Sequence, residues 1–371
     1  MTRVSDEAGA VNLAQGFPDF PAPGVLKDEA CRAIHKDVNQ YAMTWGSPRL
    51  RHALSGWYER RYGMAVDPDR EITVTCGATE AMASVFLALF DPEDEVIVPE
   101  PFYENYGPDA ILAGARPRFL SLAPPDYRLT PDRIRESVGP RTRAIVLNTP
   151  NNPTGRAFSR SELEGVADVC REHDLVAITD EIYECLRYEG PHIPIATLPG
   201  MSDRTITVSG ISKTFSVTGW RVGTVVAPED LTGAIRKVHD FLTVGAPAPL
   251  QEAAAYAYGE DMGEAYFDEL LSRYRSRRDL LVEGLREAGF ICGIPEGAYY
   301  ILADFSEISA EGDHSFARTL AREAGVAPVP GSSFFHDPEL GRSLVRFTFC
   351  KEMETLEEAV TRLRTFAGAG V

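Results

Sequence analysis

The stretches AIVLNT (residues 144–149) and LVAITD (residues 175–180) decide the fold of this chain. Each is almost continuously apolar and lacks the strict alternation of a strand that has one face in water. Continuous apolar runs of this length are typical of strands that helices cover on both faces, as in parallel sheets. The two stretches therefore predict a buried central sheet.

Five further β-branched runs extend this pattern and alternate with helical patterns along the chain. They are residues 72–76, 95–99, 117–122, 205–209 and 222–227. Strands that alternate with helices predict an α/β domain with a mostly parallel, seven-stranded sheet. Ligands of such sheets bind beyond the carboxyl ends of the strands, so the residues that follow each run are the candidate site residues.

The pattern changes near residue 266, where a long helix is expected. Its apolar positions are Tyr266, Leu270, Tyr274, Leu281 and Leu285. Short strand-like runs and one helical stretch follow, which predicts a smaller α+β domain. We expect a large domain over residues 41–265 and a small C-terminal domain over residues 266–371. Residues 1–40, rich in Pro and Gly, are expected to pack on the small domain.

The composition excludes several classes of protein. Of 371 residues, 44% are apolar and 25% are charged, which is typical of a soluble globular chain. The net charge of 37 − 55 = −18 argues against nucleic acid and anionic membranes as partners. The cysteines and histidines lack the spacing of metal ligands, so we expect no metal site. Without a signal-like N-terminus or a membrane-length apolar run, we expect a cytoplasmic protein.

The stretch SGISKTFSVTGWRVG (residues 209–223) holds the residues with the clearest chemistry. Lys213 follows a Gly- and Ser-rich turn at a strand end, and Arg221 follows eight positions later. A lysine amine can form a Schiff base with an aldehyde, and arginine grips phosphate in two places. The small and apolar neighbours argue against two solvated surface side chains. A nucleotide-binding P-loop would require glycine directly before the lysine, where Ser212 stands.

Three further segments place polar groups at strand ends. Asp180 ends the run LVAITD, where a buried acid needs a cationic partner such as a protonated pyridine nitrogen; a helix N-cap is the alternative. Asn152, in the turn NTPNNPTG (148–155), offers an amide donor at the same edge. TCGATEA (75–81) predicts a helix start that can seat a phosphate, or an ordinary turn with Thr79 as N-cap.

Taken together and in this order, these segments resemble the class I aminotransferases, which are fold type I pyridoxal-5'-phosphate enzymes. The resemblance runs from about Asn12 to Phe349 and is strongest in GISKTFSVTGWRVG (210–223). It also rests on NLAQGFPDF (12–20), QYAMTWGSPRLRHAL (40–54), EPFYENY (100–106), DEIYECLRYEG (180–190) and VRFTFCKE (345–352). The segments are most similar to the kynurenine and glutamine-phenylpyruvate aminotransferase subgroup, some of whose members are also cysteine-conjugate β-lyases.

The resemblance implies that the chain binds pyridoxal 5'-phosphate. Lys213 would hold the cofactor as a Schiff base and then shuttle a proton during the reaction. Asp180 would keep the pyridine nitrogen protonated, Tyr183 and Asn152 would hydrogen-bond the ring 3'-oxygen, and Tyr103 would stack on the ring. The implied reaction moves the amino group of an L-amino acid to a 2-oxo acid.

The resemblance also assigns the phosphate and the substrate. The implied phosphate residues are Gly77, Ala78, Thr79, Ser212 and Arg221. Tyr41 would reach the phosphate from a neighbouring subunit, which implies a homodimer with shared active sites. Arg346 would clamp the substrate α-carboxylate, assisted by Asn152 and the backbone of Gly16.

Two of the chain's departures from the family pattern bear most directly on the cofactor and the substrate. Gly210 stands where many members have a phosphate-binding serine, so Ser209 or Ser212 would have to help. Val244 and Gly245 stand where the subgroup has a lid of aromatic rings, which predicts poor turnover of kynurenine-like substrates. A β-lyase acting on a cysteine conjugate is an alternative. A non-catalytic module is a remote one, because the lysine is present and no DNA-binding extension occurs.

Overall fold

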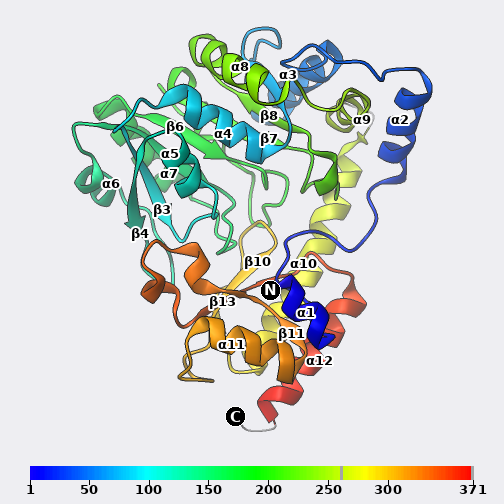
Figure 1. Ribbon diagram of the computed structural model, residues 1–371, viewed down its shortest axis with the longest axis vertical. Coiled ribbons are helices and arrows are strands. Elements are labelled where there is room, and N and C mark those ends of the chain that lie inside the picture. The colour runs from blue at the N-terminus through cyan, green and yellow to red at the C-terminus, as the bar shows by residue number, and fades with distance from the viewer. Residues whose placement is uncertain (260–261, 369–371) are drawn as a thin grey trace.

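The computed structural model describes residues 1–259 and 262–368. Figure 1 shows a large sheet flanked by helices and a smaller sheet-and-helix part below it. The long helix α10 (Glu264–Glu287) runs from one part into the other. Phe267 near its start belongs to an apolar core of the large part, whereas Leu270, Leu281 and Leu285 belong to the core of the small part. The helix therefore joins the two cores.

The large sheet has seven strands, as the apolar runs predict. Their order in the sheet is β2 (Ile72–Thr75), β8 (Gly223–Val226), β7 (Thr205–Gly210), β6 (Val176–Asp180), β5 (Thr142–Asn148), β3 (Glu95–Glu100) and β4 (Arg116–Ser121). Every neighbouring pair is parallel except those of β8, which runs antiparallel to both β2 and β7. The prediction of a mostly parallel seven-stranded sheet is confirmed.

Helices cover both faces of this sheet, which explains the continuous apolar runs. One face packs against α4 (Ala78–Leu89), α5 (Tyr106–Leu112) and α8 (Glu229–Thr243), and the other against α6 (Pro131–Ser137) and α7 (Arg160–Glu172). Successive strand residues point to opposite faces: Val96 and Val98 of β3 enter the first core, and Ile97 enters the second. Burial of both faces fixes the register of the strands.

A third core holds the helices beside the antiparallel edge of the sheet. Here α2 (Gly24–His35) and α3 (Pro48–Tyr62) pack on α9 (Ala248–Tyr258). Trp57 of α3 lies between Tyr258 and Phe267, with ring centroids 5.3 and 5.2 Å away. No helix of the described residues is both long and apolar enough to cross a membrane.

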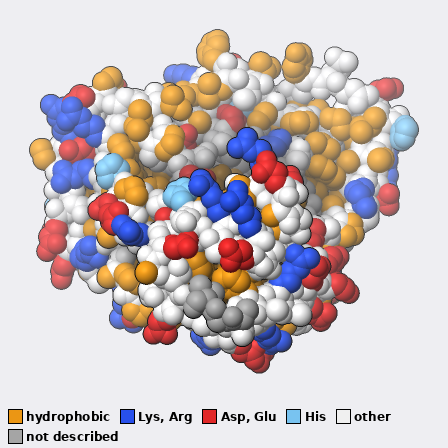
Figure 2. All heavy atoms as spheres, turned by 60° about the horizontal axis from the view of Figure 1, so that its bottom comes forward, with side chains coloured by type: hydrophobic (Ala, Val, Ile, Leu, Met, Phe, Trp, Pro, Cys, Tyr) orange, Lys and Arg blue, Asp and Glu red, His pale blue; other side chains and the backbone are white. Residues whose placement is uncertain are grey.

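The small part has the expected α+β composition. Its four-stranded antiparallel sheet has the order β12 (Val329–Pro330), β13 (Leu344–Thr348), β10 (Tyr300–Asp304) and β9 (Ile291–Cys292). Around it lie α10, α11 (Asp313–Thr319) and α12 (Met353–Gly368). Phe305 and Phe316 stack in its core with ring centroids 4.0 Å apart. On the face shown in Figure 2, Lys and Arg side chains are interspersed with Asp and Glu.

The N-terminal segment contacts both parts. After α1 (Thr2–Ala8), strand β1 (Val11–Asn12) pairs in parallel with β11 (Val326–Ala327) of the small part, while α2 packs on α9 of the large part. The chain thus crosses from the small part to the large part within its first forty residues. The domain bounds 1–40, 41–265 and 266–371 stay a prediction.

Candidate active site

A cavity opens at the carboxyl ends of the parallel strands. It holds about 730 Å³ of space free of protein atoms, including its open mouth. This is the position where ligands of open α/β sheets bind, and the volume suits a cofactor with its substrate. The predicted site residues that line it are Ala78, Thr79, Tyr103, Asn152, Asp180, Tyr183, Ser212, Lys213 and Arg221.

Lys213 lies in the connection between β7 and β8, at the centre of the cavity wall. Its Nζ donates to the carbonyl oxygen of Gly16 at 3.1 Å and lies 5.7 Å from the ring centroid of Tyr299. Burial, reinforced by the positive charge of Arg346, lowers the pKa of Lys213 from 10.5 to about 8. A substantial fraction of this amine is therefore neutral near physiological pH, which a nucleophile or proton acceptor requires.

Asp180 ends β6 and is buried beneath the cavity. Its carboxylate accepts from Tyr106 Oη at 2.7 Å and from the Ile182 amide at 3.2 Å. Burial raises the pKa of Asp180 although both donors favour the ionised form. Across residues 1–259 and 262–368 it forms no ion pair, so a ligand cation would relieve the cost of burying this carboxylate.

Tyr183 and Asn152 line the same cavity as the lysine. The Tyr183 hydroxyl is 3.2 Å from the hydroxyl of Tyr300, and burial holds the pKa of Tyr183 well above its usual value. The Asn152 amide nitrogen of the backbone donates to Asn148 Oδ1 at 2.7 Å, which fixes the turn after β5. Both side chains are buried neutral groups that present hydrogen-bonding atoms to the cavity.

The first turn of α4 forms a cradle for an anion with Arg221. Within the described part of the chain no side chain caps this helix, so its first amides are free to bind a ligand. A Cβ atom at Gly77 would lie 2.2 Å from Arg221 Nη2, and one at Gly223 would lie 2.4 Å from Gly77 C. Only glycine at both positions lets the guanidinium reach the helix end.

The two serines near Gly210 have different roles. Ser209 is buried, and its hydroxyl donates to Glu184 Oε1 at 2.9 Å, on the side of β7 away from the cavity lining. Ser212 lines the cavity beside Lys213. Of the two serines proposed to replace the missing one at Gly210, Ser212 alone is placed to do so.

Arg346 of β13 lies at the edge of the cavity toward the small part. Its Nη1 donates to Asn152 Oδ1 at 2.9 Å and its Nη2 to the Ala14 carbonyl at 2.8 Å. The buried Nε has no partner among the described residues. The guanidinium stacks 4.3 Å from the ring centroid of Tyr300, which holds it in place.

Gly16 is placed where a larger residue would not fit. A Cβ atom there would lie 1.8 Å from the Tyr300 hydroxyl. Its carbonyl oxygen already accepts from Lys213 and from the Tyr299 hydroxyl at 2.8 Å. The carbonyl therefore orients the resting lysine, and only the amide of Gly16 could assist a substrate carboxylate.

Tyr41 and Val244 lie outside the cavity lining. Tyr41 is 88% exposed and Val244 is 45% exposed. Val244 ends α8 with a φ of 66°, which is unusual for a β-branched residue. A Cβ atom at Gly245 would lie 3.3 Å from the Thr44 carbonyl, so the segments that hold Tyr41 and Val244 are adjacent. Cys76 Sγ, at the turn before α4, lies 3.4 Å from the Gly245 carbonyl oxygen, which places these exposed segments beside the anion cradle; we call them the rim.

Comparison with known proteins decides which family has this arrangement. The model of the family "Aminotransferase class I and II" matches residues 8–363. The chain belongs to this family. The resemblance seen in the sequence is thereby confirmed, and this aminotransferase has the fold of the family's pyridoxal-phosphate enzymes.

Several relatives cover nearly the whole aminotransferase. It is 40% identical to a probable N-succinyldiaminopimelate aminotransferase of Mycobacterium tuberculosis, over 99% of this chain and 95% of that protein. It is 36% identical to human kynurenine–oxoglutarate transaminase 1, over 98% and 93%. The solved structure of YbdL from Escherichia coli, reported to have a methionine aminotransferase function, has a TM-score of 0.94 at 36% identity, over 98% and 95%. These relatives are aminotransferases, so the β-lyase alternative gains no support.

The residues of the cavity fit pyridoxal 5'-phosphate, the cofactor of this family. The cradle of α4 and Arg221 suits a phosphate, the unpaired Asp180 carboxylate suits a protonated ring nitrogen, and Lys213 supplies an amine of lowered pKa. When bound, the cofactor supplies an aldehyde carbon that takes up an amino group and a ring that withdraws electrons.

Sequence reasoning missed three residues of the aminotransferase site: Tyr106, Asn148 and Tyr300. Asn148 Nδ2 donates to the Asp180 carbonyl at 3.0 Å and holds two strand ends together. Tyr106 and Asn148 fall inside the quoted segments EPFYENY and NTPNNPTG, and position at a strand end could have identified Asn148. Tyr300 occupies an ordinary strand and gives no local signal.

Proposed function

We propose that the aminotransferase reaction takes place around Lys213, with the side-chain roles that the family resemblance implies. The observation that carries this proposal is the placement of a buried amine of lowered pKa in one cavity with an unpaired carboxylate and an anion cradle. Lys213 Nζ would bind the cofactor aldehyde and afterwards take up and return the proton of the substrate α-carbon.

Other residues would bind and orient the reactants. Asp180, oriented by Tyr106, would hold a proton on the cofactor ring nitrogen. Tyr183 and Asn152 would donate to the ring oxygen, and Tyr103 would cover the ring face. The phosphate would bind at the residues from the α4 turn and the β7–β8 connection: Gly77, Ala78, Thr79, Ser212 and Arg221.

Arg346 would bind the α-carboxylate of the amino acid. Its guanidinium has an unpartnered buried Nε and lies against Asn152, which supports binding of a carboxylate at this end of the cavity. The Gly16 amide would be a further donor. When a substrate carboxylate binds, Arg346 would exchange its hydrogen bonds to Asn152 and Ala14 for bonds to the substrate, so its contacts would differ between the empty and the filled site.

The open rim at Val244 and Gly245 favours amino acids with long or polar side chains over aromatic ones. The mycobacterial relative is a probable N-succinyldiaminopimelate aminotransferase, and a substrate of that shape would suit such a rim. We therefore propose that this class of amino acid is a better donor than kynurenine.

The enzyme would act as a homodimer. Exposed apolar side chains lie near the cradle, with Phe241 90%, Leu242 48% and Met43 45% exposed, beside Tyr41. Burial of these side chains against a second copy would bring Tyr41 to the partner's phosphate. The cytoplasmic location inferred from the sequence is also part of the proposal, and cell fractionation tests it.

Absorbance of the purified holoenzyme during titration with single amino acids tests the reaction. Amino acids that act as donors should convert the cofactor to its amine form, and an added 2-oxo acid should restore the starting spectrum. The panel includes N-succinyldiaminopimelate, methionine, aspartate and kynurenine. Release of ammonia and pyruvate from a cysteine conjugate, without the amine form, would instead indicate a lyase and contradict the proposal.

A further inference from the structure

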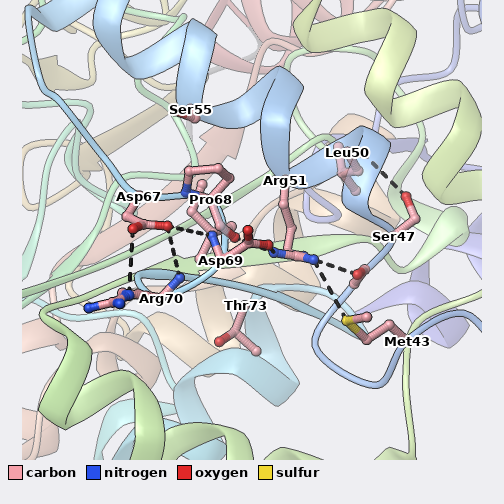
Figure 3. Close-up of polar contacts among 12 residues, drawn as sticks. Met43, Ser47, Leu50, Arg51, Ser55, Asp67, Pro68, Asp69, Arg70 and Thr73 are labelled. Atoms are coloured by element: carbon pink, nitrogen blue, oxygen red, sulfur yellow. Dashed lines mark hydrogen bonds and ion pairs between the residues drawn. The ribbon is translucent and has the colours of Figure 1, made fainter.

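The segment between α2 and α3, residues 38–47, is held to the large part by two cations from different helices. The first is Arg51 of α3, which is fully buried. Its Nε donates to the Gly46 carbonyl at 3.1 Å, and Nη1 pairs with Asp69 Oδ1 at 2.6 Å. Figure 3 shows the side chain of Arg51 between Asp69 and Met43. Arginine stays charged at all relevant pH values, so this anchor does not titrate.

The second cation is His239 of α8, which has no exposed surface. Its Nε2 lies 2.8 Å from the Thr44 carbonyl oxygen, and its Nδ1 lies 3.0 and 3.1 Å from the two oxygens of Glu80. The Glu80 carboxylate also accepts from the Cys76 amide at 2.9 Å and from Ser84 Oγ at 2.5 Å. The Thr44 carbonyl and an ionised Glu80 carboxylate only accept hydrogen bonds. The Thr243 hydroxyl, the other polar group near Nδ1, is farther away at 3.3 Å, so the geometry favours hydrogen on both ring nitrogens.

We propose that His239, as an imidazolium, is a positioning residue that fastens segment 38–47 to the first turn of α4 and releases it on losing a proton. The bridge joins the two elements that, under the proposed function, hold the cofactor phosphate: the α4 turn of one chain and the segment that carries Tyr41 to the other. Only the effect on the phosphate site rests on the proposed function. The contacts of His239 with Thr44 and Glu80 lie within one chain.

The two hydrogen-bond acceptors, the Glu80 carboxylate and the Thr44 carbonyl, determine which ring nitrogen of His239 loses its proton. Nδ1 faces a carboxylate, which holds its hydrogen more strongly than a neutral carbonyl does. The proton therefore leaves Nε2, whose lone pair then faces the Thr44 oxygen and repels it. Deprotonation breaks the contact to Thr44 and leaves the contact to Glu80 intact.

The surroundings of His239 set the direction of this response. The titratable groups around it are Glu80 of α4, Asp240 of its own helix and Cys76 at the turn before α4. Burial opposes the charged form, but the hydrogen bond and charge of Glu80 outweigh burial and raise the pKa of His239 above its usual 6.5. The bridge is therefore closed below this raised pKa and opens as the pH rises through it.

The same bridge affects the anion cradle. Glu80 places a negative charge in the first turn of α4, where a phosphate would bind, and the imidazolium offsets that charge. Glu80 Oε2 also accepts from the Cys76 amide, which fixes the turn that leads into the helix. A single proton thus affects the anion cradle of its own chain and, under the proposed function, the segment that serves the partner's phosphate.

Hydrogen exchange measured by mass spectrometry on the full-length protein without cofactor tests the proposal. The reporters are the amides of Gly46 and Ser47, which donate to Met43 O at 2.8 Å and Gln251 Oε1 at 2.7 Å. Protection factors, corrected for intrinsic exchange, are followed from about pH 6 to about pH 9. Light scattering confirms that the oligomeric state does not change across the series.

In the wild type we expect the protection of this peptide to fall by roughly tenfold as pH rises, the effect of losing one hydrogen bond to a charged group. His239→Asn keeps a donor toward Glu80 but cannot reach Thr44, so protection should be low at every pH. Glu80→Gln lets a neutral histidine keep its hydrogen on Nε2, so protection should stay high at every pH. His173→Asn, in a partly exposed His–Glu pair at the C-terminal end of α7, is the matched control and should behave as wild type.

Two results would overturn the proposal: wild-type protection that does not depend on pH, or Glu80→Gln protein that loses protection with the same pH dependence as wild type. The second variant keeps the test decisive even if His239→Asn does not fold. These outcomes concern segment 38–47 within one chain. They stand apart from whether Tyr41 serves the partner's site, which subunit mixing decides.

Discussion

The inner wall of the cavity and its rim differ in how completely one chain builds them. On the wall, Lys213, Asp180 and Tyr183 each have partners within the chain and are held at strand ends or in the connections that follow. On the rim, Tyr41 is 88% and Val244 45% exposed, and neither lines the cavity. The comparison teaches that a single chain assembles the proposed reacting groups. Under the proposed function, closure of the site and substrate choice would depend on a surface that this chain leaves exposed.

The largest expected effect is at the centre of the wall. Lys213→Ala should lower turnover at least about a thousandfold, because it removes the group proposed as both covalent anchor and proton carrier. Lys237→Ala, on the exposed side of α8, is the matched control and should retain activity. Borohydride reduction of the holoenzyme followed by peptide mapping checks the anchor. Cofactor found on any other lysine would refute the assignment.

A smaller loss of turnover is expected at Asp180, which lies beneath the cavity. Asp180→Asn should lower turnover by roughly a hundredfold or more while cofactor still binds, because the negative charge that holds a proton on the ring nitrogen is gone. Tyr106→Phe removes only one donor to that carboxylate and should cost roughly tenfold. Steady-state kinetics with saturating cofactor measure both. Near-normal turnover of the Asn variant would overturn the role of Asp180.

The rim should affect substrate choice rather than turnover in general. Val244→Phe should raise kcat/KM for kynurenine and phenylalanine by roughly tenfold to a hundredfold, because a ring restores about 1 to 3 kcal/mol of contact. Val244→Leu adds volume without a ring and serves as the control. A wild type that prefers kynurenine to every aliphatic, polar and sulfur-containing amino acid would show that the argument from the open rim is wrong.

The smallest expected effect is the pH dependence of the reactivity of Lys213. Because burial lowers the pKa of Lys213 to about 8, its amine is neutral above that pH and protonated below it. In protein freed of cofactor, acylation of Lys213 by a small reagent should rise with pH around a midpoint near 8 and then level off. Mass spectrometry of the Lys213 peptide measures the rate. A midpoint at the ordinary lysine value of 10.5 would contradict the buried, positively charged surroundings.

The sequence predicted the side chains of the cavity wall far better than the residues that hold them in place. Strand ends such as Asp180 are visible because a buried apolar run stops at a polar residue. Tyr300 gave no such signal, since its hydroxyl meets Tyr183 only through a contact 117 positions apart. The Lys213 contact with Gly16 spans 197 positions and is equally invisible to local pattern.

Within the fold, the long apolar runs predicted all seven strands of the large sheet. The direction of β8 was not predicted: β7 and β8 are joined by the Lys213 connection rather than by a crossover helix, so they run antiparallel. The two-residue strand β12 is too short to leave a periodic signal. Its pairing with β13 is set by the packing of the small part.

Subunit mixing tests most directly the claim that one chain builds the wall and a second completes the rim. Tyr41→Phe chains are combined with Lys213→Ala chains, each inactive or impaired alone, and the heterodimer is isolated with two different tags. If Tyr41 reaches across, both defects fall in one site and the other site is intact, so the heterodimer should recover about half of the wild-type activity per dimer. Verified heterodimers that recover no activity would contradict the shared site.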